Sequence, residues 1–282
     1  MPTADEIVHA QRVAWDGLAA GWATWDRVIM DQLAPVGAEM IEALGVGTDQ
    51  QHLDIASGTG EPGLTAACLA PAGRVVLTDL SPEMLGVAAR RARELHLTNV
   101  DTSVCRADEL PFADASVDSV SVRFGYMFFP DLDSATAEFA RVLRPGGGLA
   151  ASVWIRPDSN PWTSITMQAI GSEVELPAPD PDGPNMFRCA APGQVAQLFD
   201  RAGLIEVDEW DVDVELVTAT AEEYWAVLSE HVSLAVAALA PVDDTTRARI
   251  RSRAIAAVRE YELDGAVRVP GAARVIVGTA PR

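Results

Sequence analysis

A glycine-rich loop is the first stretch of the chain whose residue types could bind a ligand. Residues 53–63 read LDIASGTGEPG, in which Gly58, Gly60 and Gly63 satisfy the spacing G-x-G-x-x-G. Glycines at this spacing let the backbone turn tightly and approach a polar ligand closely. Asp54 interrupts the apolar residues before the loop, and a carboxylate there suits a cation or an ammonium group better than a pyrophosphate. The loop predicts a cofactor site, with a nicotinamide dinucleotide and a cationic cofactor as alternatives.

Two further carboxylates stand at the ends of later apolar stretches. Asp79 ends the stretch RVVLTD, where it could accept hydrogen bonds from both hydroxyls of a ribose. Asp108 begins a loop after the next apolar stretch, where it could accept a hydrogen bond from the amino group of adenine. Both positions therefore favour a ligand that contains adenosine.

The elements that must position these residues alternate between short apolar stretches and helical stretches. The apolar stretches predict buried strands at 52–57, 74–79, 100–107, 117–129 and 148–155. Helices are predicted between them at 63–70, 81–97 and 131–147. This alternation predicts an α/β fold with a mostly parallel, Rossmann-like sheet and helices on both faces. Ligands of such sheets bind beyond the carboxyl ends of the strands, which is where the glycine-rich loop lies.

The rest of the chain predicts helices and a few more strands around this core. Residues 1–45 and 221–264 have apolar residues at helical spacing, and the proline-rich stretch 157–193 predicts an irregular insertion with a helix near 161–171. A helix at 193–203 and strands at 204–216 and 272–280 are expected to complete the core.

We therefore expect one domain, 1–282, with two kinds of segment. The cofactor-binding core is predicted to comprise 48–155, 193–214 and 272–282. A helical lid over the substrate is predicted to comprise 1–45, 156–192 and 215–271.

Composition and charge limit the classes of partner. The 282 residues include 21 Lys plus Arg against 41 Asp plus Glu, a formal net charge of −20, which repels nucleic-acid phosphates and anionic lipid. No apolar run approaches the ~20 residues that span a bilayer, and the polar N-terminal residues do not resemble a signal peptide. Cys68, Cys105 and Cys189 form no C-x-x-C pair, so we expect a reducing, cytoplasmic environment.

Five segments, taken in order and spacing, resemble one enzyme family. They are LDIASGTG, LTDLSPEML, RADELPFADASVDSV, SVRFG and LRPGG, which together cover about 53–155. Their pattern is similar to class I S-adenosylmethionine-dependent methyltransferases, in particular the ubiquinone/menaquinone-biosynthesis-like group (methyltransferase type 11), and residues 187–204 resemble a later helix of that family. The resemblance implies S-adenosyl-L-methionine as the cofactor and methyl transfer as the reaction.

The resemblance also assigns cofactor contacts by position. The methionine end of the cofactor is expected to lie against the loop residues Asp54, Ser57, Gly58 and Gly60. The adenosine end is expected to contact Asp79 at the ribose, Leu80 and Met84 at the adenine face, and Asp108 with Glu109 or Leu110 at the adenine edge. Arg123 is expected near the sulfonium or the methionine carboxylate. Trp22 and Trp25-Asp26 replace tyrosines that are common in the family, so packing under the lid is the alternative to a cofactor contact.

The acceptor is less well defined by the sequence than the cofactor. His9, His52, His96 and His231 are isolated, so no metal site is predicted, but His231 lies in the predicted lid and could act as a general base. A surface or packed histidine is the alternative. The aromatic stretch 126–129 after the fourth strand could line an apolar acceptor pocket, or could simply pack in the core.

Three classes of function stay open at this point. A small organic acceptor methylated at carbon, oxygen or nitrogen, as in quinol or secondary metabolism, is the first. An NAD-dependent oxidoreductase that uses the same loop is the second. A protein with the methyltransferase fold that binds its ligand without turnover is the third.

Overall fold

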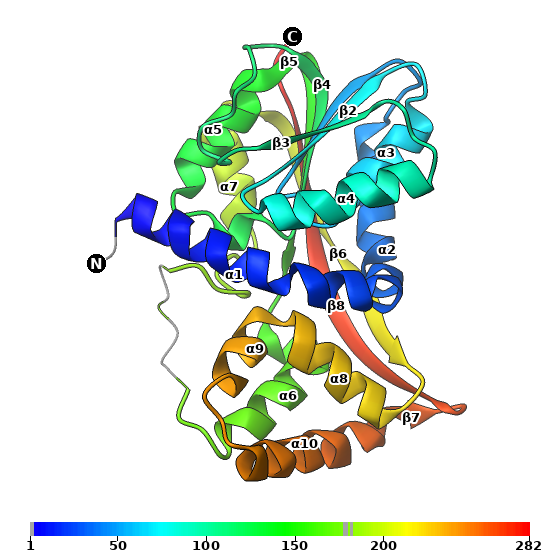
Figure 1. Cartoon of the computed structure of the whole chain (residues 1–282). Helices are drawn as coiled ribbons and strands as arrows, with labels where there is room; N and C mark the ends of the chain where they lie inside the picture. The colour runs from blue at the N-terminus through cyan, green and yellow to red at the C-terminus, as the bar shows by residue number, and fades with distance from the viewer. Residues whose placement is uncertain (1–2, 177–179, 181–182) are drawn as a thin grey trace.

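The sheet at the centre of the molecule contains eight strands (Figure 1). The computed structural model describes residues 3–176, 180 and 183–282, and the strand order is β3-β2-β1-β4-β5-β8-β6, with β7 paired to β8. The strands are β1 Gln51–Ile55, β2 Arg74–Asp79, β3 Val100–Val104, β4 Val117–Arg123, β5 Leu143–Trp154, β6 Ile205–Thr218, β7 Glu262–Leu263 and β8 Ala266–Thr279. The first five pair in parallel and the rest antiparallel, which confirms the predicted α/β class and mostly parallel sheet.

Helices cover both faces of this sheet and form a separate group beside it (Figure 1). They are α1 Ala4–Thr24, α2 Asp26–Leu44, α3 Gly63–Leu69, α4 Pro82–Glu94, α5 Leu132–Val142, α6 Pro161–Gly171, α7 Gln194–Arg201, α8 Ala221–His231, α9 Ser233–Leu239 and α10 Asp244–Val258. In Figure 1, α2 and α3 lie on one side of the sheet, whereas α5 and α7 lie on the other. Right-handed crossovers between parallel strands produce this two-sided arrangement.

Side chains with a hydrogen-bond acceptor begin several of these helices. Ser81 accepts a hydrogen bond from the backbone N–H of Met84 at the start of α4, and Pro82 occupies the first helical position. Thr220 caps α8 and Asp243 caps α10 in the same way. Because α4 begins directly after β2, its cap fixes the turn in which Asp79 and Leu80 lie.

The predicted helix at 131–147 ends earlier than the sequence pattern indicated. Helix α5 ends at Val142, and β5 begins at Leu143. Leu143 has φ −70° and ψ 136°, so the chain is already extended there. Arg144 precedes Pro145, and a residue before proline disfavours the helical conformation, which explains the early change to a strand.

Strands β6 and β8 extend well beyond the other strands of the sheet. Each has 14 residues, and their antiparallel register continues from Ile205↔Thr279 to Thr218↔Val267. Figure 1 shows the two strands running from the region of β5 toward α6, α8 and α10. Both strands continue into 215–271, which the sequence placed in the lid, so this helical group is attached directly to the central sheet.

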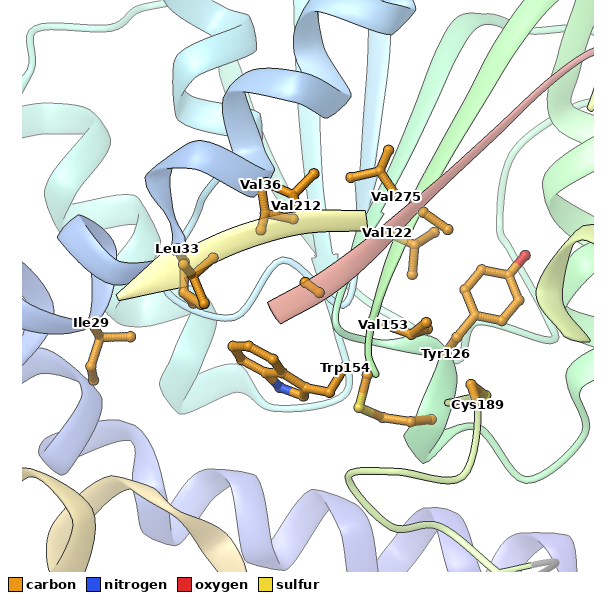
Figure 2. Close-up of a cluster of buried hydrophobic side chains, with 14 of the residues drawn as sticks. Ile29, Leu33, Val36, Val122, Tyr126, Val153, Trp154, Cys189, Val212 and Val275 are labelled. Carbon is orange, nitrogen blue, oxygen red and sulfur yellow. The ribbon is translucent and has the colours of Figure 1, made fainter. Parts of the chain in front are cut away.

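Helix α2 packs on the sheet, although the sequence placed residues 1–45 in the lid. Ile29, Leu33 and Val36 of α2 are buried in the main hydrophobic core. Figure 2 shows these side chains near Val212 of β6 and Trp154 of β5. Burial of such side chains stabilises the fold by about 1.5–3 kcal/mol each, and here it also holds α2 firmly beside the ends of β4 and β5.

Two further observations concern the segments outside the core. Within the proline-rich stretch 157–193, residues 177–179 and 181–182 lie outside the described part of the structure. Among the described residues, no helix combines the length and the hydropathy that crossing a bilayer requires.

Candidate functional site

The loop between β1 and α3 adopts a conformation that depends on its glycines. Gly58 has φ 52° and Gly60 has φ 113°, in the region that side chains disfavour. A Cβ on Gly60 would lie 2.7 Å from Leu64 Cδ1, and one on Gly63 would lie 2.8 Å from Asp54 Oδ2. Glycine at these positions therefore lets the loop fold back over the end of β1 and over the Asp54 carboxylate.

Asp54 lies behind the loop and is fully buried. Its Oδ2 accepts a hydrogen bond of 2.9 Å from the backbone N–H of Gly63, and its Oδ1 accepts one of 2.6 Å from the Ser121 hydroxyl. Burial raises the pKa of Asp54 to about 7, while these hydrogen bonds act in the opposite direction. Asp54 and Gly60 are not among the residues that line the cavity described below, so Asp54 would act on a ligand through its charge and through the loop.

A chain of buried side chains across β1 and β4 leads to Asp54. His52 Nδ1 lies 2.8 Å from Ser119 Oγ, and His52 Nε2 lies 2.9 Å from Ser121 Oγ. When Asp54 is ionised, the Ser121 hydroxyl donates its hydrogen to the carboxylate. Ser121 Oγ must then accept a hydrogen bond from His52 Nε2–H. His52 Nδ1, which carries no hydrogen in this tautomer, accepts one from the Ser119 hydroxyl. Burial lowers the pKa of His52 to about 4, which keeps its ring neutral in this role.

Asp79 ends β2 and organises the turn beside the loop. Its Oδ2 accepts a 2.9 Å hydrogen bond from the backbone N–H of Gly58, and its Oδ1 accepts one from the N–H of Ser81. Burial raises the pKa of Asp79, whereas these backbone hydrogen bonds lower it. Each carboxylate oxygen retains capacity for a further donor, which fits the predicted contact with a ribose diol.

Asp108 is held in a fixed orientation by an arginine that the sequence did not single out. Arg106 donates from Nε to Asp108 Oδ1 at 2.9 Å and from Nη2 to Oδ2 at 2.8 Å, and this pairing lowers the pKa of Asp108. The remaining Nη1 of Arg106 donates to Asp5 at the start of α1. Glu109 is exposed and does not line the cavity, although its neighbour Asp108 does.

A single large cavity brings most of the predicted site residues together. It encloses about 1420 Å³, including its open mouth. Of the residues that the sequence singled out, it is lined by Trp22, Ser57, Gly58, Asp79, Leu80, Met84, Asp108, Arg123, Phe128, Phe129 and His231. The lining residues come from the glycine-rich loop and from helices α1, α2 and α8, so one continuous cavity joins the loop to the helical group.

Arg123 presents a buried positive charge to the cavity. It ends β4, and its Nη2 contacts the sulfur of Met30 at 3.4 Å. Burial lowers the pKa of Arg123, while the carboxylates of Glu61 and Asp54 act against that shift. None of the described carboxylates lies within ion-pair distance of its guanidinium, which leaves the group available to an anionic part of a ligand.

Several buried polar atoms at the same cavity lack a hydrogen-bond partner among the described residues. They are Trp22 Nε1, Gln32 Nε2, Ser57 Oγ and Thr59 Oγ1. Buried polar groups in native proteins are nearly always satisfied, and leaving one unpaired costs about 1–3 kcal/mol. A polar ligand at the loop would satisfy the two hydroxyls, so the residues present fit the amino-acid end of the expected cofactor.

Seven aromatic rings in successive contact form another part of the cavity wall. We call this group the aromatic chamber; its members, in order of contact, are Phe124, Trp154, Trp162, His231, Trp22, Trp15 and Phe128. Phe124 and Trp154 are stacked, with ring centroids 4.2 Å apart and planes at 14°. Phe124 also has φ 58°, an unfavourable backbone conformation for a bulky residue and one that recurs at functional sites.

His231 ends α8 and is 5% exposed. Its Nδ1 lies 2.7 Å from the carbonyl oxygen of Val227, and because a carbonyl only accepts, Nδ1 carries the hydrogen. The neutral ring therefore presents the lone pair of Nε2. Burial lowers the pKa of His231 to about 4.

The aromatic stretch 126–129 divides between core and cavity. Phe128 and Phe129 line the cavity. Tyr126 and Met127 are buried in the main core, where the Tyr126 hydroxyl lies 3.2 Å from Thr136 Oγ1. Figure 2 shows Tyr126 among these core side chains, beside Val153 and Cys189.

Sequence reasoning missed the residues whose role depends on three-dimensional proximity. Ser119 and Ser121 alternate with valines in β4, and this period-2 polar pattern was a usable signal. His52 was noted only as an isolated histidine. The sequence gave no signal for Gln32 or Arg106. Gln32 matters because its buried side-chain amide has no hydrogen-bond partner, and Arg106 because it contacts Asp5 of the distant helix α1. Among the described residues, no group of His, Cys, Asp and Glu could hold a metal ion.

The matches to known proteins are concentrated in the core of the chain rather than in the segments around it. A family model described as a methyltransferase domain matches residues 53–147. An uncharacterized protein of Mycobacterium tuberculosis is 38% identical over 137 residues, which are 48% of this chain and 49% of that protein. The match thus spans about half the length of that relative.

Two other proteins extend the comparison beyond the core. The ubiquinone/menaquinone biosynthesis C-methyltransferase of Acidiphilium cryptum is 31% identical over 180 residues, covering 59% of this chain and 70% of that enzyme. The solved structure of Haemonchus contortus phosphoethanolamine N-methyltransferase 2 has a similar fold, with a TM-score of 0.59 at 17% identity, covering 100% of this chain and 61% of that one. The sequence segments, the sheet order and these relatives agree, and the chain belongs to the class I S-adenosylmethionine-dependent methyltransferases of the ubiquinone/menaquinone-biosynthesis-like group.

Proposed function

We propose that this protein transfers a methyl group from S-adenosylmethionine to a small, apolar or aromatic organic acceptor, at a carbon, oxygen or nitrogen atom. The observation that carries the proposal is the single cavity that joins the glycine-rich loop and Asp79 to the aromatic chamber. The lining extends from Gly58 and Asp79 to Trp162 and His231, so an acceptor could lie in the same cavity as the cofactor. The acidic net charge of −20 argues against a nucleic-acid acceptor.

The cofactor-binding residues have distinct tasks in this proposal. Asp79 would accept hydrogen bonds from the ribose hydroxyls, Asp108 would lie at the adenine edge, and Leu80 and Met84 would pack against the adenine face. Arg123 would pair with the methionine carboxylate, because its guanidinium lacks a carboxylate partner within the described chain. When bound, S-adenosylmethionine supplies a methyl group on a positively charged sulfur, which keeps the electron pair of the broken bond.

The enclosed cavity contributes mainly by aligning the acceptor and excluding water. The rings of the aromatic chamber present flat apolar surfaces that restrict the orientation of a planar acceptor. Alignment of this kind can lower a barrier by several kcal/mol, since the entropy of orientation is lost on binding rather than in the reaction step.

His231 is the proposed general base when the acceptor must lose a proton. The proton would move to Nε2, and the electron pair that bound it would remain on the acceptor atom that forms the new bond to carbon. The resulting imidazolium would lie at the C-terminal end of α8 and keep its hydrogen bond to the Val227 carbonyl, and both features favour a positive charge. The net charge of the site stays the same, because the sulfonium loses its positive charge when the imidazolium gains one.

Calorimetric titrations of the protein with S-adenosylhomocysteine and with NADH, side by side, test this proposal. We expect S-adenosylhomocysteine to bind at micromolar order and NADH to give no measurable heat, because Asp54 places a buried carboxylate behind the loop where a pyrophosphate would lie. Tighter binding of NADH would favour the oxidoreductase alternative. Binding of S-adenosylhomocysteine without turnover of any acceptor would favour a protein that only binds its ligand.

A further inference from the structure

Besides the indole N–H of Trp22, two polar groups in the acceptor part of the cavity have no partner within the described chain. One is the side-chain amide of Gln32 on α2, and the other is Nε2 of His231 at the end of α8. Gln32 is 2% exposed and His231 is 5% exposed, and both line the cavity. Neither group is used by the cofactor contacts described above.

Gln32 is an unusual residue for its position in the core. It lies one turn after Ile29 and one turn before Val36, both of which are fully buried. Ile29 and Leu33 of the same helix belong to the main hydrophobic core, as does Trp154, a member of the aromatic chamber. An amide nitrogen this deeply buried without a partner destabilises the fold, so a ligand that pairs with it gains affinity.

The ring of His231 is fixed in position as well as in tautomer. It stacks on Trp162, with centroids 6.4 Å apart and planes at 18°, and meets the edge of Trp22 at 5.7 Å. Together with the hydrogen bond to Val227, these contacts hold Nε2 as an acceptor. A ligand must therefore bring a hydrogen-bond donor to this nitrogen.

Every charged side chain among the described residues that line the cavity lies in the part assigned to the cofactor and its loop. Among the described lining residues they are Glu61, Asp79, Arg106, Asp108 and Arg123. The aromatic chamber contributes rings alone, and its only titratable member, His231, is neutral. A charged acceptor would lose its hydration there without gaining a counter-ion, which is unfavourable.

We propose that the acceptor is an uncharged, planar ring compound with two oxygen substituents, an inference that rests on the proposed function. One is a hydroxyl group that donates to Nε2 of His231. The other is a carbonyl-type oxygen that accepts from the amide of Gln32. The hydroxyl is the group placed for deprotonation, which would make its oxygen and the ring carbons ortho and para to it more nucleophilic.

Three fluorescent bicyclic probes separate the two contacts without any substitution. 7-Hydroxycoumarin carries a hydroxyl and a carbonyl oxygen, coumarin carries only the carbonyl oxygen, and 2-naphthol carries only the hydroxyl. Binding is measured by fluorescence titration of the protein saturated with S-adenosylhomocysteine, at a pH where the hydroxyls are protonated. We expect 7-hydroxycoumarin to bind about tenfold more tightly than either of the others, the effect of one hydrogen bond to an otherwise unpaired buried group.

Two variants assign each preference to its residue. Gln32→Met should abolish the preference for 7-hydroxycoumarin over 2-naphthol and leave its preference over coumarin. His231→Phe should abolish the preference for 7-hydroxycoumarin over coumarin and leave its preference over 2-naphthol. Gln168→Met, an exposed position on α6, is the matched control and should change neither preference.

The outcomes separate this inference from the proposed function. Failure of S-adenosylhomocysteine to bind would contradict the proposed function itself. Normal binding of S-adenosylhomocysteine together with equal affinities for the three probes, or with no probe binding, would overturn only the acceptor inference. Preferences that persist in Gln32→Met and His231→Phe would overturn it as well, and the comparison of probes on the unsubstituted protein stays decisive if either variant fails to fold.

Discussion

At the scale of single residues, Asp79 combines two tasks that are usually separate. Its oxygens accept hydrogen bonds from the backbone of Gly58 and Ser81, so it fixes the loop, and it also faces the cavity, where it would bind the ribose. The carboxylate is thus oriented before a ligand arrives. Pre-orientation reduces the entropy that binding costs, which makes this residue a sensitive position for substitution.

We expect Asp79→Ala to weaken the binding of S-adenosylhomocysteine by roughly 2–4 kcal/mol, because two charge-assisted hydrogen bonds from the ribose are lost. Isothermal titration calorimetry measures the effect. Asp101→Ala removes an exposed carboxylate from the neighbouring strand β3 and should leave the affinity unchanged. An unaltered affinity in folded Asp79→Ala would mean that the ribose is held by other groups.

His231 also predicts a pH dependence of stability. Its pKa is lowered from 6.5 to about 4 in the folded protein, so the unfolded chain binds a proton in this range that the folded chain does not. Its contribution is therefore present above about 6.5 and is lost as the pH falls toward about 4. Asp54 acts in the opposite direction, because its raised pKa favours the fold at low pH.

Comparison with His231→Phe isolates the contribution of His231 to the pH dependence of the free energy of unfolding, because the two proteins share all other titratable groups. Between pH 7 and pH 4.5 we expect the free energy of unfolding to fall by about 2–3 kcal/mol more in the unsubstituted protein than in the variant. Urea denaturation at both pH values gives the two differences. Parallel losses in the two proteins would show that His231 is protonated in the folded state.

At the scale of elements, β1 and β4 connect a buried histidine to the cofactor loop. Ser121 lies between His52 and Asp54, whereas Ser119 contacts only the far nitrogen of His52. A hydroxyl that donates to a carboxylate favours its ionised form, and this hydrogen bond opposes the effect of burial on the pKa of Asp54. The chain of side chains thus controls how much negative charge lies under the loop near neutral pH.

Ser121→Ala should raise the pKa of Asp54 further and weaken S-adenosylhomocysteine at pH 7 by about 1 kcal/mol, the usual contribution of one hydrogen bond. Raising the pH to 8.5 should restore much of the affinity, because Asp54 then ionises without the donor. Ser119→Ala is the matched control and should have a smaller effect at both pH values. A loss that does not change with pH would mean that Ser121 acts only by packing.

The same elements show what the sequence could and could not predict. Asp54, Gly58 and Asp79 were predictable because they lie in a short segment whose spacing reflects one strand, one turn and the next strand. The length of β6 and β8 was not, because a strand extends as far as it finds a partner, and the paired residues are between about 50 and about 75 positions apart in sequence. Gln32 could not be predicted either, since only the assembled core reveals that its amide has no partner.

At the scale of the whole molecule, α1 joins the cofactor side to the acceptor side. Asp5 pairs with Arg106, and Asp16 accepts a hydrogen bond from Ser81, both beside the cofactor residues. Immediately after α1, Trp25 Nε1 donates to Glu230 of α8. Figure 1 shows α1 crossing between the sheet and the group of α6, α8, α9 and α10. Movement of α1 is therefore the simplest way to open the cavity.

We expect ligand binding to order this cover as a unit. S-adenosylhomocysteine should slow hydrogen exchange in α1 and in residues 221–262, and an acceptor probe such as 7-hydroxycoumarin should slow it further, because closure excludes water from the site. Hydrogen exchange detected by mass spectrometry gives the comparison, with α5 as an internal control that faces away from the cavity. Equal protection with and without ligands would indicate a rigid pocket, and the lid hypothesis would be wrong.

The position of β8 has a consequence for how the protein is made. This strand comes after every other strand in the chain, yet it lies between β5 and β6 in the sheet. During synthesis, β6 and the helices that follow it must wait without their main partner until β8 has left the ribosome. The part of the sheet formed by β1 to β5 can form before β8 is made, whereas β6 can join the sheet only afterwards, and until then its exposed strand edge is a target for chaperones.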